Sequence, residues 1–357
     1  MANHRYALIM AGGRGTRFWP RSRRRNAKQV LRLFGERSLI QQTVARLNPT
    51  VTPDNVWVIT NQLLQAEIRK QLPEVPRQQI IAEPAQRNTA PCIALAAHII
   101  NGMDPEAVMG VFPADHLIEK EARFRTFVKA AFCAAESGGV VVLGIRPRWP
   151  ETGYGYIEFP KGVLGGKLDA LRVSSFREKP DPKTARKFVE RGNFYWNAGM
   201  FFWRASTILE LMRRHQPKTL TLLAGLPPFR ARNFSAALAE SYPRCEDISV
   251  DYAVLEKAGQ VSGFALDDIG WNDVGSWEAV YKLAEKDANE NAARGDVIVE
   301  SSRGNYIDAD KTVALVGVEN LIVVETPDAL LVASRERAQD VNRIVRALEA
   351  RKREDLL

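Results

Sequence analysis

Five short apolar runs alternate with helix-forming segments over the first 145 residues, and this alternation limits the possible folds more than any other feature of the sequence. Each run has the length of a buried strand and is followed by a turn and a predicted helix. The expected strands are Tyr6–Met10, Val56–Thr60, Gln79–Ala82, Ala107–Phe112 and Val140–Gly144, and the expected helices are Leu39–Leu47, Gln62–Gln71, Ala90–Ile100 and Phe124–Glu136. The pattern predicts an α/β fold with a Rossmann-like, mostly parallel mixed sheet covered by helices.

The rhythm changes after about residue 150. Strands are expected at Tyr154–Phe159, Leu171–Glu178 and Gly199–Trp203, then a helix at Ser206–His215 and a mainly helical stretch over 219–260. Four short strands about ten residues apart follow, at Val297–Glu300, Thr312–Val316, Leu321–Glu325 and Ala329–Ala333, before an amphipathic helix, Ala338–Ala350. We therefore expect one domain over 1–289 and a small β-rich module over 290–357 that ends in a helix. No strict repeat is visible, which argues against a repeat fold.

Composition excludes several classes of protein. Of the 357 residues, 45% are hydrophobic, enough to bury a sizeable core, so a mainly disordered chain is excluded. The three cysteines, Cys92, Cys133 and Cys245, are far apart and odd in number, which argues against a disulfide scaffold and favours a reducing compartment. No apolar run approaches the roughly 20 residues of a membrane span, and no secretory signal is visible. We expect a cytoplasmic protein that binds no membrane.

The positive charge is local. The formal net charge is +8, from 50 Lys and Arg against 42 Asp and Glu. Residues 14–32 contain eight basic side chains and no acid, so the remainder balances at 42 against 42. These eight are Arg14, Arg17, Arg21, Arg23, Arg24, Arg25, Lys28 and Arg32. With no nucleic-acid-binding signature elsewhere, the segment predicts a local anion site rather than a nucleic-acid surface.

A glycine-rich loop, Ala11–Arg17, follows the first strand directly. Glycines let the backbone approach an anion closely, and their N–H groups can hold phosphate. The spacing matches neither the dinucleotide fingerprint nor the P-loop. Taken alone, the loop is as compatible with an ordinary turn as with a phosphate site. The basic run that follows favours a polyphosphate ligand, because arginine and lysine both bind phosphate oxygens.

Eight motifs in chain order resemble those of the sugar-nucleotide pyrophosphorylases, and the variant of the first is similar to that of mannose-1-phosphate guanylyltransferases. They are Gly12–Pro20 with Lys28 downstream, Glu83–Pro91, Phe112–His116, Thr152–Ile157, Phe176–Pro180, Trp196–Phe201, Ser249–Val254 and Trp271–Trp277. Each motif is weak alone, but eight in order over residues 6–277 are highly specific. The resemblance implies a GT-A-like nucleotidyltransferase fold.

The family's reaction would join GTP and alpha-D-mannose 1-phosphate to give GDP-mannose and pyrophosphate. The sugar phosphate attacks the α-phosphorus in line, and it is already anionic because its second pKa lies near ~6. No general base is needed, so positive charge and positioning should provide the rate enhancement. His116, the one histidine within a motif, is then expected to pack or to orient its neighbour rather than to transfer a proton.

The resemblance also assigns residues to the nucleotide and to a metal. Nucleotide-binding positions would be Ala11, Gly12, Gly13, Gly15, Thr16, Arg17, Glu83, Asn88 and Thr89, and catalytic positions Arg17, Lys28 and Asp115. Glu83 and Asn88 would recognise guanine, although Asn88 or Thr89 could equally cap the helix that follows. Asp115 and Asp273 would hold Mg²⁺, since two carboxylates with substrate phosphates form a common magnesium site. Either aspartate alone would more commonly be a cap or a turn residue.

The sugar-phosphate positions implied by the resemblance are Tyr154, Gly155, Glu178, Lys179, Asn197 and Asp251. Lys179 would bind the phosphate, Glu178 and Asn197 the hydroxyls, and Gly155 would let the backbone approach the sugar. Asp251 is a weaker candidate, and Glu178 and Lys179 could instead form an exposed ion pair of little energetic value.

Other functions stay open at this point. The same fold could act on another sugar 1-phosphate, such as a heptose, or the protein could be a non-catalytic nucleotide-sugar sensor. The glycine spacing makes an oxidoreductase the least favoured. Bifunctional relatives carry a C-terminal isomerase domain, for which residues 290–357 are too few, so isomerase activity is not expected. The β-rich module could pack on the catalytic part or form a homodimer contact.

Overall fold

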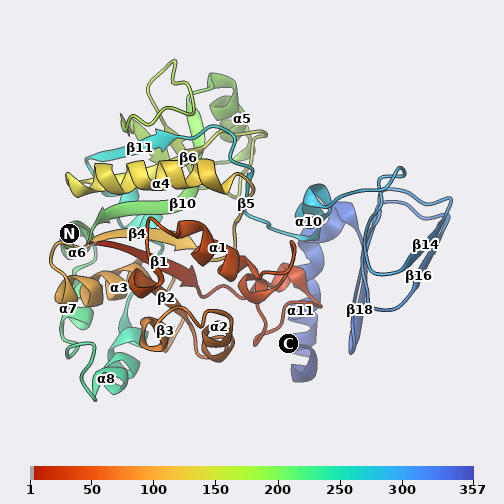
Figure 1. Ribbon diagram of the computed structural model, residues 1–357, viewed down its shortest axis with the longest axis horizontal. Coiled ribbons are helices and arrows are strands. Elements are labelled where there is room, and N and C mark those ends of the chain that lie inside the picture. The colour runs from red at the N-terminus through yellow and green to blue at the C-terminus, as the bar shows by residue number, and fades with distance from the viewer. Residues whose placement is uncertain (1–3) are drawn as a thin grey trace.

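The computed structural model describes residues 4–357 and builds them around one large sheet with a smaller β-structure at its side (Figure 1). The ten strands of the large sheet are β1 (Arg5–Ala11), β2 (Val56–Asn61), β3 (Ile80–Glu83), β4 (Val108–Pro113), β6 (Val140–Ile145), β7 (Tyr156–Glu158), β8 (Leu171–Arg172), β9 (Ser175–Arg177), β10 (Phe194–Arg204) and β11 (Val261–Ala265). The main path is β3-β2-β1-β4-β10-β6-β11-β8. Strand β10 runs antiparallel to both β4 and β6, whereas β1, β2, β3 and β4 are parallel. The predicted mostly parallel mixed sheet is confirmed.

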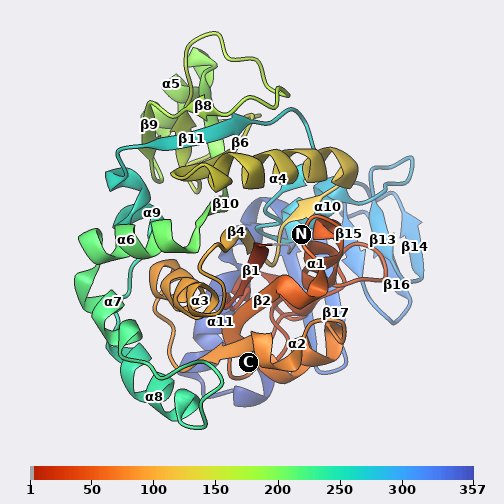
Figure 2. The same cartoon turned by 60° about the vertical axis from the view of Figure 1, so that its left-hand side comes forward.

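Helices cover both faces of the sheet because its central strands are apolar on both sides. The helices are α1 (Leu39–Leu47), α2 (Gln65–Gln71), α3 (Thr89–Met103), α4 (Glu121–Glu136), α5 (Pro182–Arg191), α6 (Ala205–His215), α7 (Pro217–Ala224), α8 (Phe234–Ser241), α9 (Val250–Ala253) and α10 (Trp277–Leu283). In β1, Ala7 and Ile9 pack in a core cluster with α1 and α4, whereas Leu8 packs in another with α3 and α6. Figure 2 shows α6, α7 and α8 following one another down the left edge.

The predicted elements of the first 145 residues are all present, with ends that shift by up to three residues. Helix α1 keeps its predicted limits because Ser38 and Gln41 form a capping box at its start. The stretch predicted as one strand over Leu171–Glu178 forms two short strands, β8 and β9, and the strand predicted at Gly199 begins earlier, at Phe194. Helices α5 and α10, strand β11 and the β5–β12 pair (Leu117–Ile118 and Trp271–Asn272) were not predicted. Their sequences are short and carry little periodic signal.

The C-terminal module is a coil of stacked strands, and the expectation of no repeat is wrong here. Its strands are β13 (Ala292–Arg294), β14 (Val297–Glu300), β15 (Tyr306–Asp308), β16 (Val313–Val316), β17 (Leu321–Thr326) and β18 (Ala329–Ser334). Strands β13, β15 and β17 pair in parallel, and so do β14 and β16, while β18 adds antiparallel to β17. Paired residues such as Val297 and Val313 or Tyr306 and Ile322 are 16 positions apart, so the chain climbs by one coil in that length.

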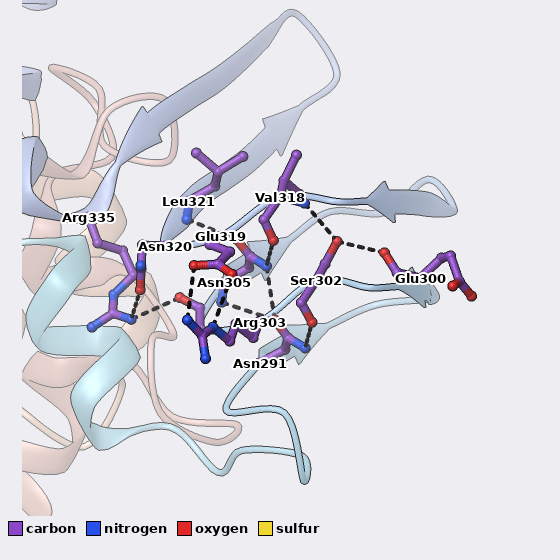
Figure 3. A network of polar contacts seen from close by, with 11 residues as sticks. Asn291, Glu300, Ser302, Arg303, Asn305, Val318, Glu319, Asn320, Leu321 and Arg335 are labelled. Atoms are coloured by element: carbon purple, nitrogen blue, oxygen red, sulfur yellow. Dashed lines mark hydrogen bonds and ion pairs between the residues drawn. The ribbon is translucent and has the colours of Figure 1, made fainter.

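Asparagine side chains form hydrogen bonds between successive coils, and such isolated polar residues give no visible repeat in the sequence. The Asn305 amide donates to the side-chain oxygen of Asn291 at 3.0 Å, and the Asn305 oxygen accepts from the Leu321 N–H at 2.9 Å. Figure 3 shows this network crossing the coils, with Ser302 bonded to Val318 beside it. The repeated feature is thus a few polar side chains and a strand register rather than a run of identical residues. The division at residue 289 and a homodimer contact through this module stay predictions.

A short 3-10 segment, Arg335–Asp340, leads from the coils to α11 (Val341–Ala350), which begins three residues later than predicted. Helix α11 returns to the part of the chain that carries the large sheet and runs downward below α10 in Figure 1. Its Val341 and Val345 share a buried cluster with Phe18 and Trp277, so one core joins the module to the segment after the glycine loop. Among residues 4–357, no helix has the length and apolar character needed to cross a membrane.

Candidate active site

Three adjoining cavities open at the carboxyl ends of β1, β3 and β4, where open α/β sheets bind their ligands. The glycine cavity, about 520 Å³, is lined by Ala11, Gly12, Gly13, Gln29, Glu83, Gln86, Asn88, Thr89, Asp115 and Asp247, among others. The β10 cavity, about 280 Å³, is lined by Tyr154, Gly155, Glu178, Asn197, Asp251 and Asp273, among others. The aspartate cavity, about 330 Å³, is lined by Gly15, Thr16, Arg17, Phe18, Lys28, Asp115, His116, Asp273, Val274, Gly275 and Asn342. Asp115 and Asp273 are each shared between two of these cavities.

The glycine loop is held close to the residues that follow it. Gly15 adopts φ +60, and a Cβ there would lie 2.6 Å from the Cβ of Lys28, so this position requires glycine. A Cβ at Gly12 would lie 2.8 Å from a carboxylate oxygen of Glu83. The Gln29 amide donates to the carbonyls of Ala11 and Gly13, at 2.7 and 3.1 Å. The loop therefore forms a thin wall between the end of β1 and the glycine cavity.

Lys28 connects the two aspartates. Its buried ammonium donates to the Asp115 carboxylate at 2.8 Å and also to the main-chain carbonyl of Asp273. Burial is the largest influence and acts to raise the pKa of Asp115, but the Lys28 ammonium together with the other neighbouring charges and hydrogen bonds outweighs it, so that pKa lies below its ordinary value. Asp115 is therefore a carboxylate at neutral pH. Among residues 4–357 no cluster of three or more His, Cys, Asp or Glu side chains has the arrangement of a metal site, and a metal role for Asp115 and Asp273 stays a prediction.

The position of the Asp273 backbone depends on the next residue, Val274, which has an unusual backbone conformation. Val274 adopts φ +47, a strained conformation for a β-branched residue, and its N–H donates to the Asn272 side chain at 2.7 Å. Val274 is fully buried in the cluster that contains Phe18 and Trp277. Packing thus maintains a turn that presents Asp273 to both the β10 and aspartate cavities.

Glu83 is a buried carboxyl at the wall of the glycine cavity. Burial raises its pKa to about 7, although the hydrogen bond that it accepts from the Tyr242 hydroxyl at 2.5 Å opposes the shift. Tyr242 bonds to only one of the two oxygens, and the other approaches Gly12. Glu83 therefore has an acceptor directed to the cavity side.

Asn88 and Thr89 both have structural partners as well as a place in the glycine cavity. The Asn88 side chain accepts from the N–H of Thr89 at 3.0 Å and caps α3, and the residue adopts φ +61. The Thr89 hydroxyl accepts from the Val250 N–H at 2.9 Å. The capping alternative is therefore present in the structure, and a role for Asn88 in base recognition stays a prediction.

The β10 cavity gathers five of the six predicted sugar-phosphate residues. The Asn197 amide donates to Asp251 at 3.0 Å, and a bulge in β10 after Asn197 turns that side chain into the cavity. Burial raises the pKa of Asp251 to about 6, with the neighbouring Glu178 carboxylate adding to the shift. A Cβ at Gly155 would lie 2.4 Å from Glu178, so glycine is required for that approach. Two carboxyls and an amide thus face one small cavity, whose other walls are largely apolar.

Lys179 is the sugar-phosphate residue that lines none of the three cavities. Its ammonium pairs with Glu178 at 2.5 Å, the ion pair that was the alternative interpretation. The side chain is 57% exposed, so the pair itself adds little stability. Binding of a sugar phosphate by Lys179 would require the ammonium to leave Glu178, and that role stays a prediction.

His116 packs rather than titrates in this structure. Its Nδ1 accepts from the Trp271 indole N–H at 3.2 Å, and its carbonyl accepts from Arg46. Burial lowers its pKa to about 4, so the ring is neutral at physiological pH. This geometry agrees with the expected packing role.

The expectation that the basic segment as a whole binds an anion is wrong. Four of its arginines pair instead with acids of the C-terminal module: Arg14 with Glu349, Arg21 with Asp308, Arg23 with Asp328 and Arg24 with Glu354. The Arg24 N–H also donates to the Leu357 carbonyl, and the Trp19 indole to that of Leu356. Arg17 and Lys28 alone among the eight basic residues line the aspartate cavity. The acids lie 287 to 335 positions away along the chain, so no local pattern could reveal them.

Several lining residues were not predicted, and three of them are polar side chains that could bind a ligand: Gln29, Asp247 and Asn342. Gln29 follows Lys28 within the first motif, so its position signalled it. Asp247 and Asn342 carry no sequence signal, because each reaches its cavity from a distant element.

Comparisons with known proteins agree with this geometry. A family model described as nucleotidyl transferase matches residues 6–290, and one described as MannoseP isomerase/GMP-like beta-helix domain matches 295–348. The xanthan biosynthesis protein XanB of Xanthomonas campestris pv. campestris (strain B100) is 40% identical over 349 residues, which is 96% of this chain and 73% of that protein. The mannose-1-phosphate guanylyltransferase of Escherichia coli is 40% identical over 351 residues, 97% of this chain and 74% of that one.

A solved structure extends the likeness to three dimensions. The crystal structure of a protein from Thermus thermophilus, described as a mannose-1-phosphate geranyltransferase, superposes with a TM-score of 0.85 and 33% identity. The match covers 97% of this chain and 99% of that one. The second family model also identifies the coiled C-terminal module as a β-helix. On these matches and on the glycine loop and aspartates that they cover, the chain is a nucleotidyltransferase and belongs to the nucleotidyl transferase family.

Proposed function

We propose that the protein is a mannose-1-phosphate guanylyltransferase, which converts GTP and alpha-D-mannose 1-phosphate to GDP-mannose and pyrophosphate. The single observation that carries the proposal is the contact of Lys28 with both Asp115 and Asp273 at the junction of the three cavities. The three cavities have side chains suited to a nucleoside, a triphosphate and a sugar, and the cavities adjoin at that junction. The identity of the E. coli relative supports the choice of substrates.

Each cavity binds one part of the substrates. The guanosine lies in the glycine cavity beside Glu83 and Asn88, and the triphosphate enters the aspartate cavity between Arg17 and Lys28. Mannose lies in the β10 cavity against Glu178 and Asn197. The sugar phosphate then faces the α-phosphorus, as in-line attack requires.

Positive charge and placement perform the chemistry. Both reacting groups are anions, so their approach is opposed by Coulomb repulsion, which the fixed ammonium of Lys28 and the guanidinium of Arg17 offset. Lys28 is buried and held by two oxygens, so little reorganisation is needed when charge develops. No base is required, and the neutral, hydrogen-bonded His116 takes no proton.

Asp115 and Asp273 fit a hard divalent cation. They present oxygen donors only, at a place where substrate phosphates supply the remaining ligands. Mg²⁺ bound there would neutralise phosphate charge and orient the two substrates. Lys28 already bonds to one Asp115 oxygen, so this lysine orients the carboxylate that would hold the ion.

Base selection follows from the acceptors in the glycine cavity. Guanine presents an N1–H and an amino group, which Glu83 can accept once it is ionised. Adenine would leave the Glu83 oxygen that does not accept from Tyr242 unpaired, at a cost of about 1–3 kcal/mol.

The test is a pyrophosphate-release assay with GTP, ATP and dTTP, each combined with mannose 1-phosphate, glucose 1-phosphate and a heptose 1-phosphate. We expect the highest kcat/KM for GTP with mannose 1-phosphate. If the protein prefers another sugar phosphate, the proposed substrate is wrong but the proposed reaction type stands. No release with any pair, together with tight binding of a nucleotide sugar, would instead identify a sensor.

A further inference from the structure

One side chain of the aspartate cavity comes from the C-terminal module. Asn342, in the first turn of α11, lines the cavity together with Arg17, Lys28 and both aspartates. Every other lining residue lies at or before Gly275, within the match to the nucleotidyl transferase family, which ends at residue 290. The module therefore contributes directly to a cavity that the catalytic part would otherwise form alone.

Asn342 is free to bind a ligand. Within residues 4–357 its amide has no hydrogen-bond partner, and the side chain is partly exposed. Other asparagines of the module, such as Asn291 and Asn305, are engaged in the network between coils. An amide nitrogen offers two N–H donors, which suit phosphate oxygens.

The position of Asn342 is fixed relative to Arg17. Its neighbour Val341 and Val345 one turn later are buried in the same cluster as Phe18, which follows Arg17 in sequence. Ion pairs flank this contact, with Arg14 bonded to Glu349 of α11 at 2.6 Å and Arg21 bonded to Asp308 at 2.7 Å. The charged segment after the glycine loop thus holds α11 in place, and α11 places Asn342 over the cavity.

We propose that Asn342 is a pyrophosphate-binding residue, whose amide N–H groups donate to the β- or γ-phosphate of GTP and then to the departing pyrophosphate. The proposal rests on the placement of the triphosphate in the aspartate cavity given above. It also gives the β-helix module a part in the reaction, because α11 has to be docked for the cavity to be complete. The base and the sugar lie in other cavities, so Asn342 should affect GTP and pyrophosphate but neither mannose 1-phosphate nor GDP-mannose.

The test uses the reverse reaction of the full chain, in which GDP-mannose and pyrophosphate give GTP and mannose 1-phosphate. Asn342→Asp keeps the shape and places a negative charge against the phosphates, and we expect it to raise the KM for pyrophosphate by about tenfold or more. Asn342→Ala should raise it by roughly threefold to tenfold, since only the hydrogen bonds are lost. The KM for GDP-mannose should stay within about twofold in both variants, a split that general damage to the fold would not produce.

Ala347→Asp is the matched control, because it adds the same charge on an exposed, differently directed position of α11. Arg17→Gln is the reference for the cavity and should also raise the KM for pyrophosphate. If Arg17→Gln has this effect while the Asn342 variants behave like Ala347→Asp, the inference is wrong and the proposed function stands. If neither Arg17 nor Asn342 affects the KM for pyrophosphate, the triphosphate lies elsewhere, and both the Asn342 inference and its placement in the aspartate cavity are wrong. If the natural chain forms no GTP from GDP-mannose and pyrophosphate, the proposed function itself is wrong.

Discussion

The Lys28 ammonium lies 2.8 Å from the Asp115 carboxylate, and the same nitrogen donates to the main-chain carbonyl of Asp273. One buried lysine thus joins the end of β4 to the turn before α10. Because the two aspartates come from distant parts of the chain, Lys28 sets their relative position as well as supplying charge.

Replacing this lysine should damage catalysis more than folding. Lys28→Met keeps the length of the side chain but removes the charge, and we expect kcat for GDP-mannose formation to fall by about 10²-fold or more. Pyrophosphate release measures the rate, and a thermal melt reports on the fold. Lys161→Met, at an exposed position, is the control. A loss of less than tenfold in a folded Lys28→Met protein would contradict the assigned role.

The metal assignment predicts a specific defect in the aspartate variants. Asp115→Asn and Asp273→Asn should each lower turnover by roughly 10²-fold or more and weaken Mg²⁺ binding in the presence of nucleotide. Calorimetric titration of Mg²⁺ into the GTP complex of a slowly reacting variant gives a readout separate from activity. Near-normal turnover with unchanged Mg²⁺ affinity in either variant would remove that aspartate from the metal site.

The raised pKa of Glu83 predicts that the free energy of unfolding depends on pH. Its pKa rises from an ordinary 4.5 to about 7 through burial, so the folded chain retains a proton that the unfolded chain releases between those values. The free energy of unfolding should therefore fall as pH rises from about 4.5 to 7, by at most about 3 kcal/mol. Glu83→Gln, which can still accept from Tyr242, should be more stable than the natural protein at pH 8 and nearly equal to it at pH 5.

The same variant links stability to base selection. Glu83→Gln should lose part of its preference for GTP over ATP, because its one amide oxygen accepts from Tyr242 and its NH2 group then faces the guanine N–H donors. Urea denaturation at the two pH values measures stability, and competing-nucleotide kinetics measures selectivity. An equal stability difference at pH 5 and pH 8 would show that Glu83 does not hold the extra proton.

Two arginines of the basic segment should differ strongly in their contribution to stability. Arg21 makes two hydrogen bonds to Asp308, which is 3% exposed, so Arg21→Ala would leave a buried carboxylate unpaired and should cost about 3–5 kcal/mol. Arg24 pairs with Glu354, which is 63% exposed, and Arg24→Ala should cost less than about 1 kcal/mol from that pair. Urea midpoints compare the two variants. If the two variants lose similar amounts of free energy of unfolding, the burial of Asp308 does not determine how much this ion pair contributes to stability.

The candidate site was largely predictable because its residues stand at strand ends. Apolar runs such as Tyr6–Met10 had to form central strands, and parallel strands bring their carboxyl ends to one edge. The glycine loop, Glu83 and Asp115 follow three such strands, so their proximity needed little more than strand order. The roles of these residues in binding and catalysis are still predictions that the variants above test.

The sequence alone determined the α/β sheet, the position of the glycine loop and the segments that bear the two aspartates, because local periodicity and turn chemistry encode strands and the ends of strands. Only the tertiary structure decided that Arg14, Arg21, Arg23 and Arg24 hold the β-helix module, that the module coils, and that Asn342 reaches the aspartate cavity. A basic run has the same pattern whether it meets phosphate or carboxylate, and its partner is selected by which distant surface the packing of apolar residues brings within a few ångströms.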